Sequence, residues 1–219
     1  MTQLVSFFED KPVKKGVGLV LQRPVAESPD HGILNSDRAV PGVVYVLAPH
    51  VTRSLLVPFG QYDVWSLTER FNETLRVMNV LGAKSIECTT FGRATNRRTL
   101  VGRLPFAKAS DQRTRLEQSG FDYAHQGQGA IPMDPRPLRW PDIPGLDAAI
   151  EGVLKNQSTR TTISIDSSTE FKRDSKLAGR LQGAGFSLGA TSESNNVTVL
   201  KVEAHFPGPD ELKRLKKQG

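Results

Sequence analysis

The stretch from Trp65 to Phe91 constrains the fold of this chain most, because it predicts a helix with both ends marked and then a strand. Ser66 and Glu69 have the spacing of a capping box, in which each side chain satisfies a backbone N–H group of the first turn. Gly82 supplies the left-handed geometry that commonly ends a helix. The stretch therefore predicts a helix over 66–81, followed by a glycine and a strand.

The predicted helix has an apolar side and a polar side. Apolar residues recur at steps of three and four, as on the buried side of a helix: Leu67, Phe71, Leu75, Met78 and Leu81. The outer side is predicted to face water and carries polar residues: Arg70, Asn72, Glu73, Arg76 and Asn79. After Gly82, Ile86 and Cys88 alternate with polar neighbours, which is typical of a half-buried strand.

The same kinds of pattern predict the other elements. A short helix is expected over 2–10, and strands are expected over 17–21, 43–48, 54–57 and 161–165. Hairpins are expected over 85–104 and 185–206, the second one preceded by a helix over 174–182. A helix beginning near Pro144 and a short basic helix after Pro209 complete the set. The order helix, glycine, hairpin thus occurs twice.

These elements predict an α+β protein whose antiparallel sheets carry helices on one face, built as two similar helix–hairpin halves. Residues 120–144 contain five prolines and several glycines, which disfavour regular structure. They predict a Pro/Gly-rich linker, or a long loop pinned by Trp140. We therefore expect an N-terminal half over 1–119 and a C-terminal half with a basic tail over 145–219.

The composition of the chain limits the cellular compartments and the classes of binding partner that we expect. Cys88 is the single cysteine of 219 residues, so an intrachain disulfide is excluded and a reducing environment is favoured. The first ten residues lack the layout of a secretion signal, and no apolar run approaches the length of a membrane helix. We expect a cytoplasmic protein, with export by a route that needs no such signal left open. The net charge of +6 indicates either a basic but ordinary surface or an anionic partner.

The densest basic cluster lies on the hairpin expected over 85–104. We call residues 93–103 the arginine segment; its arginines are Arg93, Arg97, Arg98 and Arg103, and residues 91–104 contain no acidic residue. The planar guanidinium group suits phosphate, so these four arginines are the predicted anion-binding residues. A solvated basic face is the alternative. Few aromatic residues are interleaved, so no stacking platform for single-stranded nucleic acid is predicted.

Other motifs point less clearly to chemistry. Residues 185–189 match the G-x-S-x-G pattern around Ser187, but that motif needs a strand before the serine and a helix after it. Here the order is inverted, which predicts that Ser187 is an exposed residue on a strand edge. The four histidines, His31, His50, His125 and His205, are not spaced as metal ligands. No metal and no cofactor are therefore expected.

Three functional hypotheses follow. The first is a non-enzymatic binding or effector protein that engages an anionic partner, either nucleic acid or a membrane surface, through the arginine segment. The second is a membrane-active effector that disrupts membranes by rearranging its two helix–hairpin units. The third is a hydrolase that uses Ser187, with His205 as the sole downstream histidine. A protein partner is also left open.

Overall fold

The structure is a computed structural model that describes residues 3–12, 18–27, 32–34, 36–48, 55–92, 123–166, 175–189 and 197–218. The chain forms two compact units: unit 1 is Met1–Ser66 with Ser168–Ser194, and unit 2 is Leu67–Ser167 with Asn195–Gly219. Each unit has its own sheet, and the described residues include four α-helices, which confirms the α+β class. Each unit contains residues from both expected halves of the chain. The division of the chain into halves over 1–119 and 145–219 stays a prediction.

Unit 1 contains a five-stranded sheet in the order β2-β1-β4-β5-β3. The central pairs β1–β4 and β4–β5 are antiparallel, whereas the edge strands β2 and β3 pair in parallel with β1 and β5. The strands are β1 (Gln3–Phe8), β2 (Val20–Pro24), β3 (Gly32–Ile33), β4 (Val44–Ala48) and β5 (Leu55–Pro58). The strands expected over 43–48 and 54–57 are confirmed as β4 and β5.

Strand β1 replaces the helix expected over 2–10, so that prediction was wrong. Leu4, Val5 and Phe7 are all buried, with Leu4 and Val5 on opposite faces of the sheet. A strand that lies between two neighbours and is covered on both faces shows an apolar run rather than alternation. In a short segment, such a run cannot be distinguished by period from a buried helix.

The face of the unit 1 sheet that carries Leu4 is covered by a distant part of the chain. Helix α4 (Ser175–Gly183) and the residues after it contribute Leu181, Phe186 and Leu188 to a core that also contains Val46. Backbone hydrogen bonds fix this segment, because Val44 N donates to Ser187 O and Ser187 N donates to Gly42 O, each over 2.8 Å. Unit 1 is therefore completed by residues that lie more than a hundred positions further along the chain.

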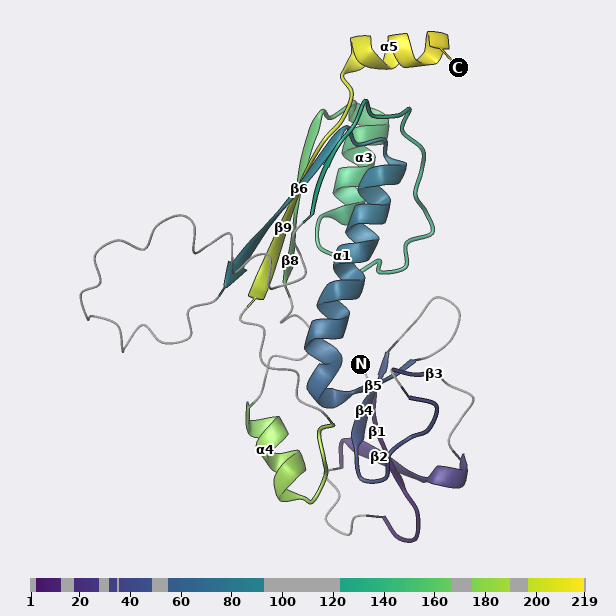
Figure 1. Cartoon of the computed structure of the whole chain (residues 1–219), viewed down its shortest axis with the longest axis vertical. Helices are drawn as coiled ribbons and strands as arrows, with labels where there is room; N and C mark the ends of the chain where they lie inside the picture. Colours follow the sequence, from purple (N-terminus) through teal and green to yellow (C-terminus); the bar gives the residue numbers. More distant parts are fainter. Residues whose placement is uncertain are drawn as a thin grey trace, which may run out of the picture. The chain divides into compact units, whose positions relative to one another are not determined.

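Unit 2 contains a four-stranded antiparallel sheet in the order β7-β6-β9-β8. The strands are β6 (Ser85–Gly92), β7 (Ala124–Gln126), β8 (Arg160–Asp166) and β9 (Val197–His205). Helices α1 (Tyr62–Val80) and α3 (Leu146–Asn156) lie on one face of this sheet (Figure 1). Ile86, Ile163 and Val202 point toward that face and are buried.

The hairpin expected over 185–206 is not formed. Strand β9 has β6 on one side and β8 on the other, so neither of its edges is available to residues 185–189. Ser187 instead forms a β-bridge with Val43 in unit 1. The two similar helix–hairpin halves are therefore not confirmed, and the return strand expected over 99–104 lies outside the described residues.

Helix α1 begins earlier than the capping-box pattern predicts. It starts at Tyr62, and Ser66 lies within it, where its hydroxyl donates a hydrogen bond to the backbone oxygen of Asp63 over 3.2 Å. The prediction that Ser66 is an N-cap was therefore wrong. Gly82, with φ of 77°, follows the helix as expected.

The second side of α1 is covered by residues 127–145, which we call the strap. The strap runs antiparallel to α1: Met133 N donates to Val80 O, the Arg76 guanidinium donates to Pro135 O, and Arg139 N donates to the Glu73 carboxylate. Unit 2 thus has three layers, namely sheet, helices and strap (Figure 1). The described part of residues 120–144 contains β7 and most of the strap, and Trp140 in the strap is buried. The choice between a linker and a long loop stays a prediction.

The strap explains an incorrect prediction about α1. Arg70 and Glu73 were expected to face water, yet they are 4% and 2% exposed. Arg70 forms an ion pair with Asp142 over 2.8 Å, and its guanidinium lies 5.2 Å from the centre of the Trp140 ring. The strap buries both side chains and supplies Asp142 to Arg70 and the Arg139 N–H to Glu73. The charge of Glu73 is balanced within α1 by Arg76, so each buried charge has a partner.

The C-terminal basic helix is confirmed as α5 (Pro209–Gln218). Lys84 fixes its first turn, because the ammonium group donates to both carboxylate oxygens of Glu211 at 3.1 and 3.0 Å. In Figure 1, α5 stands beyond the end of the sheet at which β6 begins. Among the described residues, no helix is both long and apolar enough to cross a membrane.

Candidate anion-binding surface

The four predicted anion-binding residues, Arg93, Arg97, Arg98 and Arg103, lie outside the described residues. The structure describes the strand that leads to them. β6 ends at Gly92, where it pairs with Val197 at the start of β9. The assignment of these arginines to an anion-binding site stays a prediction.

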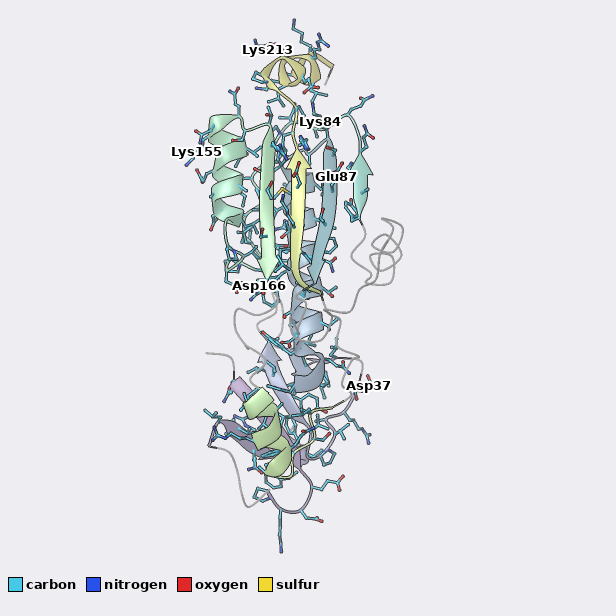
Figure 2. The ribbon with its side chains drawn as sticks, turned by 90° about the vertical axis from the view of Figure 1, so that its left-hand side faces the viewer. Asp37, Lys84, Glu87, Lys155, Asp166 and Lys213 are labelled. Carbon is cyan, nitrogen blue, oxygen red and sulfur yellow. The ribbon has the colours of Figure 1, made fainter. Side chains whose placement is uncertain are left out.

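The face of the unit 2 sheet opposite α1 and α3 is polar, and no described helix or strand covers it (Figure 2). Its centre is Glu203 on β9. The Glu203 carboxylate forms an ion pair with Arg160 over 2.7 Å and lies 3.2 Å from Nε2 of His205. The hydrogen bond from Arg160, followed by that from His205, lowers the pKa of Glu203, so this carboxylate is ionised at neutral pH.

The charge on this open face does not favour anions. Glu87 on β6 lies directly opposite Glu203 in the strand register. Asp166 is at the end of β8, and Figure 2 shows both Glu87 and Asp166 on the sheet. Against these three carboxylates, the described residues of the face include two cations, Arg160 and Lys201. An anionic macromolecule would therefore meet acidic side chains on this face.

Most cations of unit 2 that the structure describes are already neutralised. Arg136 forms three ion pairs, because its guanidinium contacts Asp134, Asp147 and Glu151 at 3.3, 3.5 and 2.8 Å. Lys155 also pairs with Glu151. The remaining pairs are Arg70–Asp142, Arg76–Glu73, Lys84–Glu211, Arg160–Glu203 and Lys213–Asp210. The charges of these side chains are therefore balanced within the unit.

Helix α5 is the main exception among the described residues. Its last turn carries Lys216 and Lys217, and both side chains are exposed. Neither they nor Arg214 forms an ion pair with a described acidic residue. Because the carboxyl end of a helix has partial negative charge, these cations also stabilise the helix. Among the described residues of unit 2, they are the basic side chains best placed to meet an anion.

Ser187 is exposed and lies in the β-bridge to Val43, as the inverted motif predicts. Its hydroxyl oxygen accepts a hydrogen bond of 3.3 Å from the N–H of Gly189. His205 belongs to unit 2 and contacts Glu203. The structure does not bring a described histidine or carboxylate within hydrogen-bonding distance of the Ser187 hydroxyl.

The other residues considered for chemistry lie apart. Cys88 is half-buried on the helix-covered side of β6, opposite Val202, and His125 is exposed on β7. His31 and His50 are outside the described ranges. Within the described part of the chain, no group of three or more His, Cys, Asp or Glu side chains is arranged to hold a metal ion.

Comparison with known proteins does not assign the chain to a family. No protein-family model matches the chain, and no curated protein or solved structure matches it.

Sequence patterns located the cations of α5 but not their surroundings. The sequence predicts a basic helix there, whereas the link between Lys84 and Glu211 joins residues 127 positions apart. Gly82 marks the end of α1 in the sequence. The residues next to it in the sequence, however, do not indicate that the strap and α5 both attach there.

Proposed function

We propose that this chain is a non-enzymatic binding protein that engages an anionic partner through the arginine segment. One observation carries the proposal. Residues 93–110 contain five basic side chains and no acidic one, whereas the described cations of unit 2 are mostly held in ion pairs. The excess positive charge of the chain is thus concentrated in a short stretch that begins at the end of β6.

The chemistry of this stretch favours phosphate groups. Four of its five cations are arginines, whose fork of donors binds two oxygens of a phosphate at once. Nucleic acid and the headgroups of an anionic membrane both present such groups. We also propose a cytoplasmic location, because the single Cys88 fits a reducing compartment.

A salt titration tests the proposal with nucleic acid. If four arginines contact phosphates of duplex DNA, raising the salt from about 0.05 to about 0.2 M should weaken binding by roughly a hundredfold. The double variant Arg97→Glu/Arg98→Glu should weaken binding sharply and reduce the dependence on salt. With vesicles of an anionic lipid, the same variant should lower the partition coefficient by at least about thirtyfold.

A matched control separates the effect of the arginine segment on binding from the effect of the total charge. Lys11→Glu/Arg180→Glu makes the same change in net charge at two exposed positions of unit 1. The control should bind nearly as the natural chain does. Equal losses in both double variants, or no loss in Arg97→Glu/Arg98→Glu, would contradict the proposal.

The two alternative functions have less support. The membrane-active alternative needs two helix–hairpin units, and residues 185–189 pair with unit 1 rather than with β9. The hydrolase alternative needs a base for Ser187, whose described hydrogen-bond partner is a backbone N–H group. We therefore do not propose either activity.

A further inference from the structure

The turn between α1 and β6, Leu81–Lys84, holds two segments that are far apart in the sequence. The strap attaches to it because Ala130 N donates to Gly82 O over 3.2 Å and Gly127 N donates to Lys84 O over 2.7 Å. Helix α5 attaches through the ion pair of Lys84 with Glu211 at 3.0 Å. These contacts place the first part of the strap and α5 at the same end of unit 2.

This end of unit 2 exposes apolar side chains. Ile131 and Met133 on the strap are 43% and 65% exposed. They are the two large exposed apolar residues that the described part of unit 2 contains. Backbone hydrogen bonds from Ala130 to Gly82 and from Met133 to Val80 fix the strap on either side of Ile131, so the exposure is built into the fold.

The same end has excess positive charge. In α5 the acidic side chains occupy the first turn and are neutralised, Glu211 by Lys84 and Asp210 by Lys213 at 3.2 Å. The later part of the helix carries Arg214, Lys216 and Lys217, and Figure 2 shows α5 and Lys84 at this end. Leu212 and Leu215, three residues apart and half-buried, mark the other side of the helix.

We propose that this end of unit 2, which we call the basic end, docks on an anionic lipid bilayer. The basic end consists of Ile131 and Met133 with the cations in the later part of α5: Arg214, Lys216 and Lys217. A short amphipathic helix with basic residues, at the same end of a unit as exposed apolar side chains, fits the boundary between headgroups and acyl chains. The inference rests on the proposed function, because it names anionic lipid as the partner.

The apolar residues favour a bilayer over nucleic acid. Phosphates of a duplex attract the lysines equally well, but Ile131 and Met133 would gain nothing from a phosphate backbone. Neither the strap between 127 and 133 nor α5 contains an aromatic residue on which a base could stack. Insertion of the two apolar side chains between lipids removes them from water and favours docking.

Co-sedimentation of the full chain with vesicles containing phosphatidylserine tests the proposal, with neutral phosphatidylcholine vesicles for comparison. Each basic residue near an anionic leaflet multiplies the partition coefficient by about five. The double variant Lys216→Glu/Lys217→Glu should therefore lower it by at least about thirtyfold. The variant Ile131→Ser/Met133→Ser should lower it several-fold and remove the part of the binding that survives at high salt.

Controls separate this proposal from the proposed function. Lys11→Glu/Arg180→Glu, with the same change in net charge, should bind as the natural chain does, and circular dichroism should show that all variants are folded. Binding to anionic vesicles that is unchanged in both basic-end variants would overturn the docking inference while leaving the arginine segment as the site. Binding to nucleic acid without binding to vesicles would also overturn it but keep the proposed function. Absence of binding to either would remove both.

Discussion

The carboxylate of Glu73 accepts two hydrogen bonds from the guanidinium of Arg76, with distances of 2.7 Å from Nε to Oε2 and 2.8 Å from Nη2 to Oε1. The backbone N–H of Arg139 donates a third hydrogen bond to Oε1 at 2.7 Å. One buried carboxylate therefore joins helix α1 to the strap. Arg76 extends the junction by donating to Pro135 O over 3.1 Å.

Replacement of this carboxylate should loosen the strap. The variant Glu73→Gln keeps the shape of the side chain but removes the charge that strengthens its hydrogen bonds. We expect a loss of about 2 to 3 kcal/mol in the free energy of unfolding, measured by urea denaturation. Glu69→Gln, one turn earlier on the same helix, is the matched control and should change stability by less than about 0.5 kcal/mol. Equal effects of the two variants would show that the junction is not a stabilising contact.

The same carboxylate should make the protein sensitive to acid. Burial alone would raise the pKa of Glu73, but hydrogen bonds from Arg76 and from the Arg139 N–H outweigh it, and the pKa lies below its usual value of 4.5. A carboxyl with a lowered folded-state pKa stabilises the protein fully above the unfolded value and loses that contribution as the pH falls through the folded value. The stability difference between natural chain and Glu73→Gln should thus be constant from pH 7 to about pH 5 and shrink below pH 4.5. A difference that grows in acid would contradict this assignment.

Gly82 should tolerate no side chain. Its φ of 77° is strained for other residues, and a Cβ atom there would collide with the backbone oxygen of Ala130. Gly82→Ala should destabilise unit 2 by about 2 kcal/mol or more. Gly179→Ala in α4 is the matched control, because nothing lies within 4 Å of its Cβ position, and it should stabilise by up to about 1 kcal/mol. Thermal unfolding of both variants by circular dichroism checks the opposite signs.

Unit 1 should depend on α4. Leu181 is fully buried against the sheet, at 0% exposure, so Leu181→Ala should cost about 2 to 5 kcal/mol. Leu19→Ala deletes the same atoms from a side chain that is 62% exposed and should have little effect. Limited proteolysis should cleave Leu181→Ala faster than Leu19→Ala, with the early cuts in residues 1–66 and 168–194. Early cuts confined to unit 2 would disprove the role of α4.

Local patterns in the sequence predicted the elements whose burial is local. The strands β6, β8 and β9 alternate clearly, and α3 and α5 have marked periodicity or charge. Predictions were wrong where a distant segment decides burial: β1 is covered on both faces, and Arg70 and Glu73 lie under the strap. The pairing of Ser187 with Val43 instead of with β9 is likewise non-local.

The candidate surfaces divide in the same way. The cations of α5 could be predicted from the sequence, because a basic helix is a local feature. Their location at the same end of unit 2 as Ile131 and Met133 could not, since it depends on the turn Leu81–Lys84, to which both segments attach. No spacing along the chain encodes that proximity.

Because unit 1 is built from two segments of the chain, the ribosome synthesises its sheet before the helix that covers it. Strands β1 to β5 emerge first, but the face of Leu4 and Val46 is covered only after Leu188 has been made. At about 5 to 20 residues per second, the intervening synthesis takes on the order of 10 s. Throughout that interval the apolar face of the sheet lacks its cover, and a nascent chain stalled before residue 175 would retain the sheet without α4.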